Sequence, residues 1–268
     1  MKLFDASPSV RWLFCPTHPD DELAVCAFIR RLRDAGAEVF INWTHATPVR
    51  RLEAVRAAAL MGVPEENLSF MPGEDGAICD QMPELFPLFR SLIDRARPDR
   101  VVCAAFEQGH LDHDATHCLV RKAFCGPVLE WPMYHPYTRR LQTMGRFSDP
   151  SGEEVLMLTS SERRFKRFMS KQYPSQNIRP VLIGYHLLCS LRLRPARLYA
   201  AERLRLCAET DYTAPAVPTR FLREVCGSHQ WRGWLAAYQR FSAESPKHSP
   251  GAGANGPTKG FDSDLGPG

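Results

Sequence analysis

Segments that are typical of buried strands alternate with segments of helical period through the first half of the chain. The expected strands are 10–15, 38–44, 67–71, 100–105 and 128–131, and the expected helices are 22–35, 50–61, 83–96 and 114–124. This alternation predicts an α/β fold with a Rossmann-like open, mostly parallel sheet flanked by helices. In the strand order 3-2-1-4-5, the loops after the first and fourth strands diverge and leave a crevice at the carboxyl ends of the strands. Functional residues are therefore expected in those two loops.

The patterns weaken after the fifth expected strand. Residues 154–158 predict a further strand, 160–172 a basic amphipathic helix and 228–241 another helix. The Leu- and Arg-rich stretch 178–209 is expected to cover the sheet edge or the pocket. From residue 242 onward Ser, Pro and Gly dominate without periodicity, which predicts disorder. The predicted organisation is a single domain, 1–241, which includes a C-terminal helical extension, 178–241, and is followed by a disordered tail, 242–268.

Composition limits the classes of partner. The net charge of +4 is small and charges of both signs are interspersed, so nucleic acid is not expected as a partner. No apolar run approaches the ~20 residues of a membrane helix, so membrane insertion is not expected. The nine cysteines are odd in number, lack a Cys-x-x-Cys spacing and mostly adjoin apolar residues, which indicates reduced, buried thiols of a cytoplasmic protein. The sequence leaves open whether the chain forms a homo-oligomer.

Both expected loops are rich in metal-binding side chains. The first expected strand is followed by His-Pro-Asp-Asp-Glu, residues 18–22, and the fourth by Gly-His-Leu-Asp-His-Asp, residues 109–114. The simplest ligand set is His18, Asp21 and His113, because two imidazoles and one carboxylate with open positions for water are the composition of a catalytic zinc site. We therefore predict a Zn²⁺ cofactor, and leave open whether another divalent metal replaces it.

Three further residues of these loops are candidate catalytic groups. His18 and Asp21 are three positions apart and are expected to share a face of the first helical turn. Asp20 would then point away from the ion, within reach of a bound water. His110 remains free to act as an acid when His113 binds the metal, and Asp112 between them is placed to orient an imidazole.

Two other features have alternative interpretations. His117, one helical turn after His113, is either a further ligand or a residue that packs and supports a ligand, and packing is favoured. Three aromatic side chains after the fifth expected strand either stack on a sugar ring or pack in the core. They are Trp131, Tyr134 and His135.

At these residues the chain resembles the LmbE and PIG-L-like family of zinc-dependent de-N-acetylases. The two loops match that family's two signatures, although the second is usually written with Pro where Leu111 stands. Weaker similarity includes RRLEAVRAAALMGV (50–63), EDGAI (74–78), Lys166 with YPSQ (173–176), and AERLR (201–205), so that it spans a core of about residues 10–215. The chain departs from many relatives at residues 44–47, where they have a Gly-Glu pair, and at Gln108.

The resemblance implies an LmbE-like fold and a role for each matching residue. His18, Asp21 and His113 would hold zinc, and Asp20 would be the general base. His110 would assist as an acid or oxyanion stabiliser, held by Asp112 and charged. Arg50 and Asp75 would contact sugar hydroxyls of the substrate.

The expected function is a zinc-dependent hydrolase that removes an N-acetyl or related N-acyl group. Its substrate would be a small N-acetylated amino sugar or an N-acetylglucosaminyl glycoconjugate. Three alternatives remain open: a zinc amidase acting on another small-molecule amide, a mononuclear iron oxygenase with a two-His, one-carboxylate triad, and a non-catalytic zinc- or sugar-binding protein. Metal analysis separates the oxygenase from the others. Retention of Asp20, His110 and Asp112 argues against a protein that only binds.

Overall fold

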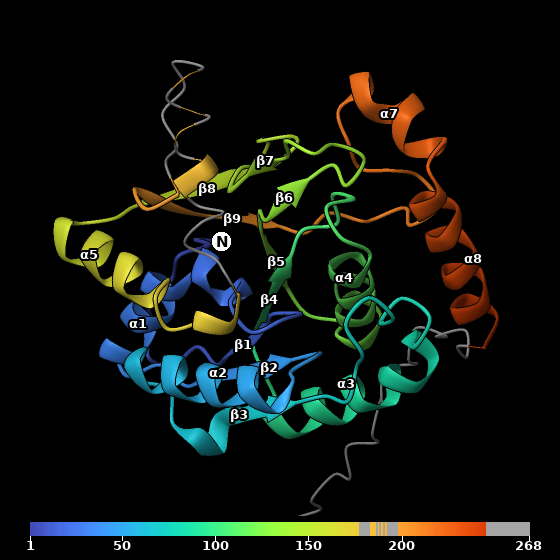
Figure 1. The fold of residues 1–268 in the computed structure, drawn as a ribbon. Helices are drawn as coiled ribbons and strands as arrows, with labels where there is room; N and C mark the ends of the chain where they lie inside the picture. Colours follow the sequence, from blue (N-terminus) through green and yellow to red (C-terminus); the bar gives the residue numbers. More distant parts are fainter. Residues whose placement is uncertain (177–182, 186, 188, 190, 192–197, 245–268) are drawn as a thin grey trace, which may run out of the picture.

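The computed structural model describes residues 1–176, 183–185, 187, 189, 191 and 198–244. Its centre is a seven-stranded sheet with the order β3-β2-β1-β4-β5-β9-β8 (Figure 1). The first five strands of that order are parallel, and β9 and β8 are antiparallel to their neighbours. Their bounds are β1 Trp12–Cys15, β2 Val39–Trp43, β3 Leu68–Phe70, β4 Arg100–Ala104, β5 Val128–Trp131, β8 Glu153–Met157 and β9 Ala201–Leu206. The predicted Rossmann-like order 3-2-1-4-5 is therefore confirmed.

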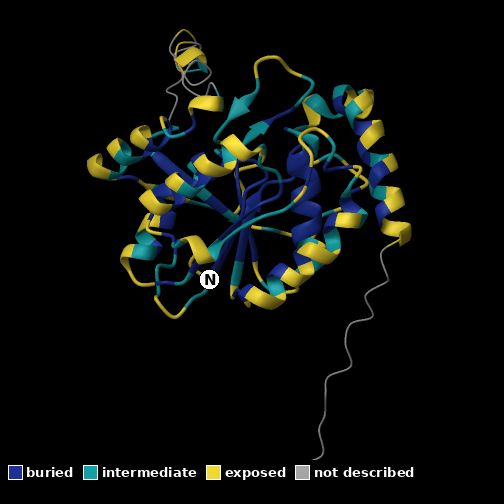
Figure 2. Cartoon of the chain, turned by 60° about the horizontal axis from the view of Figure 1, so that its bottom comes forward, coloured by how far each residue is buried: buried dark blue, intermediate teal, exposed yellow. Residues whose placement is uncertain are grey.

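Helices cover both faces of the sheet, because alternate residues of each strand point to opposite sides. Trp12 and Phe14 of β1 pack in one apolar cluster with helices α1, α2 and α5, whereas Leu13 and Cys15 pack in another with α3, α4 and α8. The helices are α1 Cys26–Asp34, α2 Pro48–Leu60, α3 Met82–Ala96, α4 Leu111–Ala123, α5 Ser160–Met169, α7 Thr219–Cys226 and α8 His229–Glu244. Figure 2 shows the result, with buried strands inside and helices exposed on their outer sides.

The smaller elements lie at the connections. They are the 3-10 helices η1 Asp21–Ala24, η2 Glu65–Asn67 and η3 Pro174–Gln176, and the two-stranded sheet of β6 Tyr134–His135 and β7 Thr143–Met144. The first helix is shorter than the predicted 22–35, because η1 precedes it and α1 begins only at Cys26. This difference changes how the first loop presents its side chains.

Strand β9 lies inside the region predicted as a helical extension, so 178–241 is not helical throughout. Three of the six side chains of β9 are charged, but Glu202 is buried and accepts hydrogen bonds from the N–H groups of Ala27 and Phe28 and from Lys166 Nζ. Such internal partners allow a charged segment to pair as an inner strand. Residues 177–182 and 192–197 of the extension lie outside the described residues.

The C-terminal prediction can be followed only in part. Helix α8 continues through Glu244, so residues 242–244 are helical, and the remainder of the predicted tail, 245–268, lies outside the described residues.

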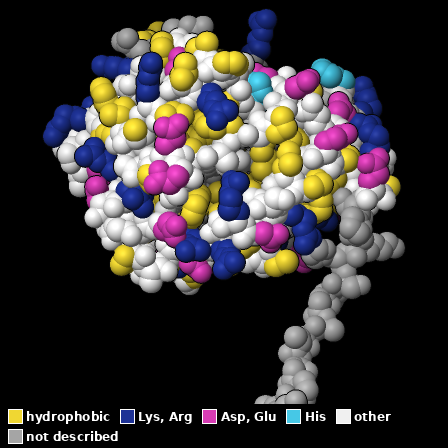
Figure 3. Space-filling model, turned by 90° about the horizontal axis from the view of Figure 1, so that it is seen from below, with side chains coloured by type: hydrophobic (Ala, Val, Ile, Leu, Met, Phe, Trp, Pro, Cys, Tyr) yellow, Lys and Arg dark blue, Asp and Glu magenta, His cyan; other side chains and the backbone are white. Residues whose placement is uncertain are grey.

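The structure can be compared with two expectations from composition, the state of the cysteines and the lack of a membrane helix. All nine cysteines are free, and five are buried, but Cys125 and Cys226 are exposed, contrary to the expectation of buried thiols. Among the described helices, none combines the length and apolar character needed to cross a bilayer. On the face seen in Figure 3, basic and acidic side chains are interspersed.

Candidate metal centre and active site

The two histidine-containing loops meet because β1 and β4 are neighbours, and Cys15 at the end of β1 is paired with Cys103, one residue before the end of β4. Ligand atoms of His18, Asp21 and His113 lie within 4.8 Å of one another, and all three residues are buried. His113 Nε2 is 3.3 Å and His18 Nδ1 is 3.8 Å from Asp21 Oδ2. Two ligands at zinc distances of ~2.0–2.2 Å are ~3.3–3.6 Å apart in a tetrahedron. The structure therefore brings the predicted metal ligands together at a spacing that suits one ion.

The first loop presents His18 and Asp21 by a turn rather than by a helical face. His18 precedes η1, and Asp21 Oδ2 accepts the backbone N–H groups of Thr17 at 3.1 Å and His18 at 2.8 Å. The predicted shared helical face is therefore wrong, although the two side chains still converge. His113 and His18 lower the pKa of Asp21 despite its burial, so this carboxylate is ionised.

Carboxylates also surround the other side of the His18 ring. His18 Nε2 lies 3.3 Å from Asp75 Oδ1 and 3.4 Å from Asp112 Oδ2, and the latter oxygen accepts the N–H of Gly76 at 2.6 Å. Although burial opposes it, the Asp112 and Asp75 carboxylates that face Nε2, together with the charge of Asp21, raise the pKa of His18 to about 10. The cluster thus stabilises positive charge, which a divalent cation would supply.

The chemistry of the donor atoms fits a zinc ion. Within the described part of the chain, His113 Nε2 is buried and has no hydrogen bond of good geometry, although it faces the Asp21 carboxylate. Two imidazoles and a carboxylate are the donors of catalytic zinc. His18 can use one ring nitrogen for the ion while the other meets a carboxylate, as metal-bound histidines do.

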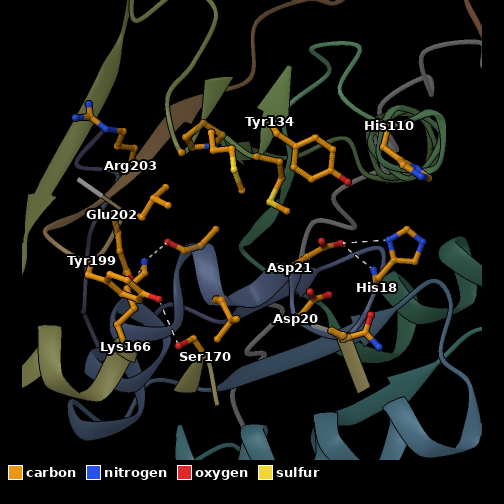
Figure 4. Close-up of a pocket in the computed structure, with 18 of the residues that line it drawn as sticks. His18, Asp20, Asp21, His110, Tyr134, Lys166, Ser170, Tyr199, Glu202 and Arg203 are labelled. Atoms are coloured by element: carbon orange, nitrogen blue, oxygen red, sulfur yellow. Dashed lines mark hydrogen bonds and ion pairs between the residues drawn. The ribbon is translucent and has the colours of Figure 1, made fainter. Parts of the chain in front are cut away.

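Asp20 lies in the wall of the cavity beside these ligands (Figure 4). Its backbone has φ 110°, in the left-handed region, and its N–H donates to Glu22 Oε2 at 3.2 Å. Burial, reinforced by the charges of Asp21 and Glu22, raises the pKa of Asp20 well above its usual range. A carboxylate in this environment is a stronger base than an exposed one.

The last residue of the first signature, Glu22, has a supporting position that the sequence analysis did not identify. Glu22 is fully buried; its Oε2 accepts from Trp43 Nε1 at 3.1 Å, and Tyr173 donates its hydroxyl to Oε1. Burial raises the pKa of Glu22 to about 7. Because Glu22 also accepts the Asp20 N–H, it fixes the turn that presents the first loop.

His110 is the N-cap of α4, and its Nδ1 accepts the backbone N–H of Asp112 at 3.2 Å. The Asp112 carboxylate lies 3.9 Å from this nitrogen, farther than from His18 Nε2. Burial and the nearby His113 lower the pKa of His110, so the structure favours a neutral ring rather than the expected charged one. An accepting Nδ1 places the ring hydrogen on Nε2.

The glycine of the second signature is required by a close backbone approach. A Cβ on Gly109 would lie 1.7 Å from the carbonyl oxygen of Tyr134. The Tyr134 ring lies 5.4 Å from that of His113 and lines the cavity, whereas Trp131 and His135 are buried. Of the three aromatic candidates, therefore, Tyr134 is the one at the site.

A cavity of about 380 Å³ connects these groups. Figure 4 shows His18, Asp20, Asp21, His110 and Tyr134 at one end and Lys166, Tyr199 and Glu202 at the other. The candidate substrate-binding residues Arg50 and Asp75 also line it, with Arg50 Nη1 3.5 Å from Asp75 Oδ2. His117 does not line the cavity, because it is fully buried and bonds to Glu130.

Comparisons with known proteins agree with this arrangement. The family model PIG-L, described as GlcNAc-PI de-N-acetylase, matches residues 13–124. A deacetylase triple mutant from the teicoplanin biosynthetic pathway has a TM-score of 0.58 and 20% identity, over 75% of this chain and 99% of that one. The zinc-inhibited form of teicoplanin deacetylase Orf2 has a TM-score of 0.56 and 18% identity, over the same shares of the two chains. N,N'-diacetylchitobiose deacetylase from Pyrococcus horikoshii has a TM-score of 0.50 and 16% identity, over 74% of this chain and 84% of that one.

At these identities the likeness to solved structures concerns the fold, which is the LmbE-like deacetylase fold. No curated protein is significantly similar to the chain. The family model, in contrast, matches the sequence itself over the segment from β1 to the end of α4, which contains both ligand-bearing loops. Through this segment, residues 13–124, the chain is similar to the PIG-L, or GlcNAc-PI de-N-acetylase, family.

Proposed function

We propose that the protein is a zinc-dependent hydrolase that removes an N-acetyl group from an amino sugar or an N-acetylglucosaminyl glycoconjugate. The observation that supports this most directly is the convergence of His18, Asp21 and His113 beside Asp20 in one cavity. The family model and the deacetylases of similar fold support the same class of reaction. The nine free cysteines support a reducing, cytoplasmic location.

Each step of amide hydrolysis has a candidate group in the chain. A Zn²⁺ ion held by the three ligands would supply a Lewis acid for the acyl oxygen and for the attacking water. Asp20 would take a proton from that water, and its raised pKa suits it to pass the same proton to the departing amine nitrogen. His110 would donate Nε2–H to the developing oxyanion. This assignment needs no cationic His110.

The cavity wall beside His18 would position the rest of the substrate. Arg50 and Asp75 lie at the same cavity and offer a guanidinium and a carboxylate to sugar hydroxyls. Asp75 is half exposed, and the contact with His18 lowers its pKa, so it is an ionised acceptor at neutral pH. A hydroxylated ring is thus better matched than an apolar amide.

The test measures free acetate and free amine from a panel of N-acetylglucosaminyl compounds. Protein stripped with a chelator should be inactive, and zinc should restore release of both products. His113→Ala, checked for folding by circular dichroism, is the control and should stay inactive with zinc. If zinc-loaded wild-type protein, with its metal content measured, releases neither product from any compound, the proposed substrate class is wrong.

A further inference from the structure

A second group of metal-binding side chains lies one turn farther along α4 than His113. His117 of α4, Glu130 of β5 and Cys207, which follows β9, have ligand atoms that lie within 4.8 Å of one another. This group contains a thiol, whereas the cluster of His18, Asp21 and His113 has only nitrogen and oxygen donors. The two groups therefore share a helix but differ in chemistry.

Two donor atoms compete for one nitrogen of His117. Its Nε2 lies 2.7 Å from Glu130 Oε1 and 3.4 Å from Cys207 Sγ. A ring nitrogen can bear one hydrogen and so satisfies one of these neighbours at a time. Zinc ligands stand ~3.3–3.8 Å apart in a tetrahedron. Cys207 is already at that spacing, and Glu130 would withdraw by ~0.6 Å to admit an ion.

The surrounding contacts hold His117 and Glu130 in orientations that suit metal ligands. Tyr212 Oη lies 2.9 Å from His117 Nδ1, where it can accept the ring hydrogen when Nε2 binds a metal. Arg205 donates Nε and Nη2 to Glu130 Oε2, at 3.0 and 2.7 Å, which leaves Oε1 for the ion. His117 and Glu130 are buried, whereas Cys207 is partly exposed and gives an ion a route from solvent.

His117 Nε2, Glu130 Oε1 and Cys207 Sγ face one another closely enough for one hydrogen or one metal ion to lie between them. A proton on Nε2 is the competing occupant. It leaves the thiol with weaker acceptors, Ala208 O at 3.2 Å and Thr210 Oγ1 at 3.6 Å.

We propose that His117, Glu130 and Cys207 form a second zinc site. Thiolate and imidazole donors select zinc over magnesium or calcium, and a water molecule would complete a tetrahedron. The ion would join α4 to β5 and to the end of β9, and so hold in place the helix that bears His110 and His113. This site is independent of the proposed deacetylase activity.

Cobalt substitution tests the proposal with a signal that only a sulfur ligand gives. Protein stripped with a chelator and loaded with Co²⁺ should show thiolate-to-metal charge-transfer absorption in the near ultraviolet. Zinc titration with metal analysis should give about two ions per chain, about one in Cys207→Ala and about one in His113→Ala. The charge-transfer band should disappear in Cys207→Ala and persist in His113→Ala. Cys226→Ala, which removes an exposed thiol elsewhere, is the matched control and should keep both ions and the band.

The wild-type spectrum decides the matter even if a variant fails to fold. A wild-type protein that binds about one ion and shows no sulfur band would overturn the proposal, as would a band that survives in folded Cys207→Ala. Glu130→Gln keeps the thiol and nearly the same volume, so it should bind Co²⁺ more weakly at this site alone. Circular dichroism of each variant verifies folding.

Discussion

Replacing Asp20 by Asn removes the candidate base with little change of shape. Asn tolerates the left-handed backbone of φ 110°, and the hydrogen bond from its N–H to Glu22 Oε2 is retained. The amide cannot take a proton from water. A positioned general base contributes ~10²- to 10⁴-fold to rate, so turnover should fall by about that factor, which corresponds to ~3–5 kcal/mol in the barrier. Because Asp20 is not one of the three ligands, zinc content should not change.

The same substitution lowers turnover but is not expected to lower stability. The pKa of Asp20 is raised in the folded protein, so the folded state binds its proton more tightly than the unfolded state does. The ionised form therefore destabilises the fold, and this contribution appears as the pH rises through the range between the unfolded and folded pKa values. Asn removes that charge. Metal-free Asp20→Asn should thus unfold at the same or a higher temperature than metal-free wild type at neutral pH.

The neighbouring carboxylate provides a matched control. Asp21→Asn changes the same functional group one residue away, but it removes a ligand, so it should bind one zinc ion fewer per chain than wild type and lose activity. Release of free amine, metal analysis and thermal unfolding are measured on all three proteins. Wild-type turnover in zinc-loaded Asp20→Asn would refute its role as the base. Loss of zinc from this variant would show instead that Asp20 is a ligand.

Three further predictions follow from individual contacts. His113→Ala should bind one zinc ion fewer per chain than wild type and lose activity, measured by metal analysis and product release; an unchanged zinc complement would show that the wrong ligand has been assigned. Gly109→Ala places a Cβ against the Tyr134 carbonyl and should destabilise the fold by at least ~1–3 kcal/mol in denaturant unfolding, whereas wild-type stability would mean that the loop relaxes freely. Lys166→Met leaves the Glu202 carboxylate buried without its cation and should cost ~3–5 kcal/mol; Lys166→Met combined with Glu202→Leu should recover part of that loss, and no recovery would contradict the pairing.

The parallel core of the sheet could be predicted because its strands have a recognisable sequence pattern. Strands such as β1 are buried on both faces and therefore read as continuous apolar runs, with helices between them. The proximity of His18, Asp21 and His113 followed from the strand order, since adjacent parallel strands bring the loops that follow them to one edge of the sheet. Those inferences needed only local pattern and topology.

What could not be predicted depends on partners far away in the sequence. Arg203 and Arg205 of β9 look solvent-exposed in the sequence, yet they pair with Glu153 and Glu130. Likewise, nothing near Glu22 in the chain indicates that Tyr173 and Trp43 will bind its carboxylate. A charged residue can be placed inside only once its counter-ion is known.

The histidine at the N-cap of α4 and the two histidines within the helix lie about one turn apart, yet they have three different positions relative to the cavity. His110 lies at the N-cap, where its ring reaches the cavity and its Nδ1 caps the helix. His113, in the first turn, faces Asp21 across the sheet edge. His117 is another turn along, and side chains one turn apart have Cβ atoms ~5–6 Å from each other, so both can reach one ion only if their rings tilt together. Tyr212 and Glu130 hold the His117 ring from both nitrogens and prevent this tilt. Spacing alone therefore could not decide whether His117 binds the first ion. Its contacts with Glu130 of β5 and with Tyr212 exclude that role.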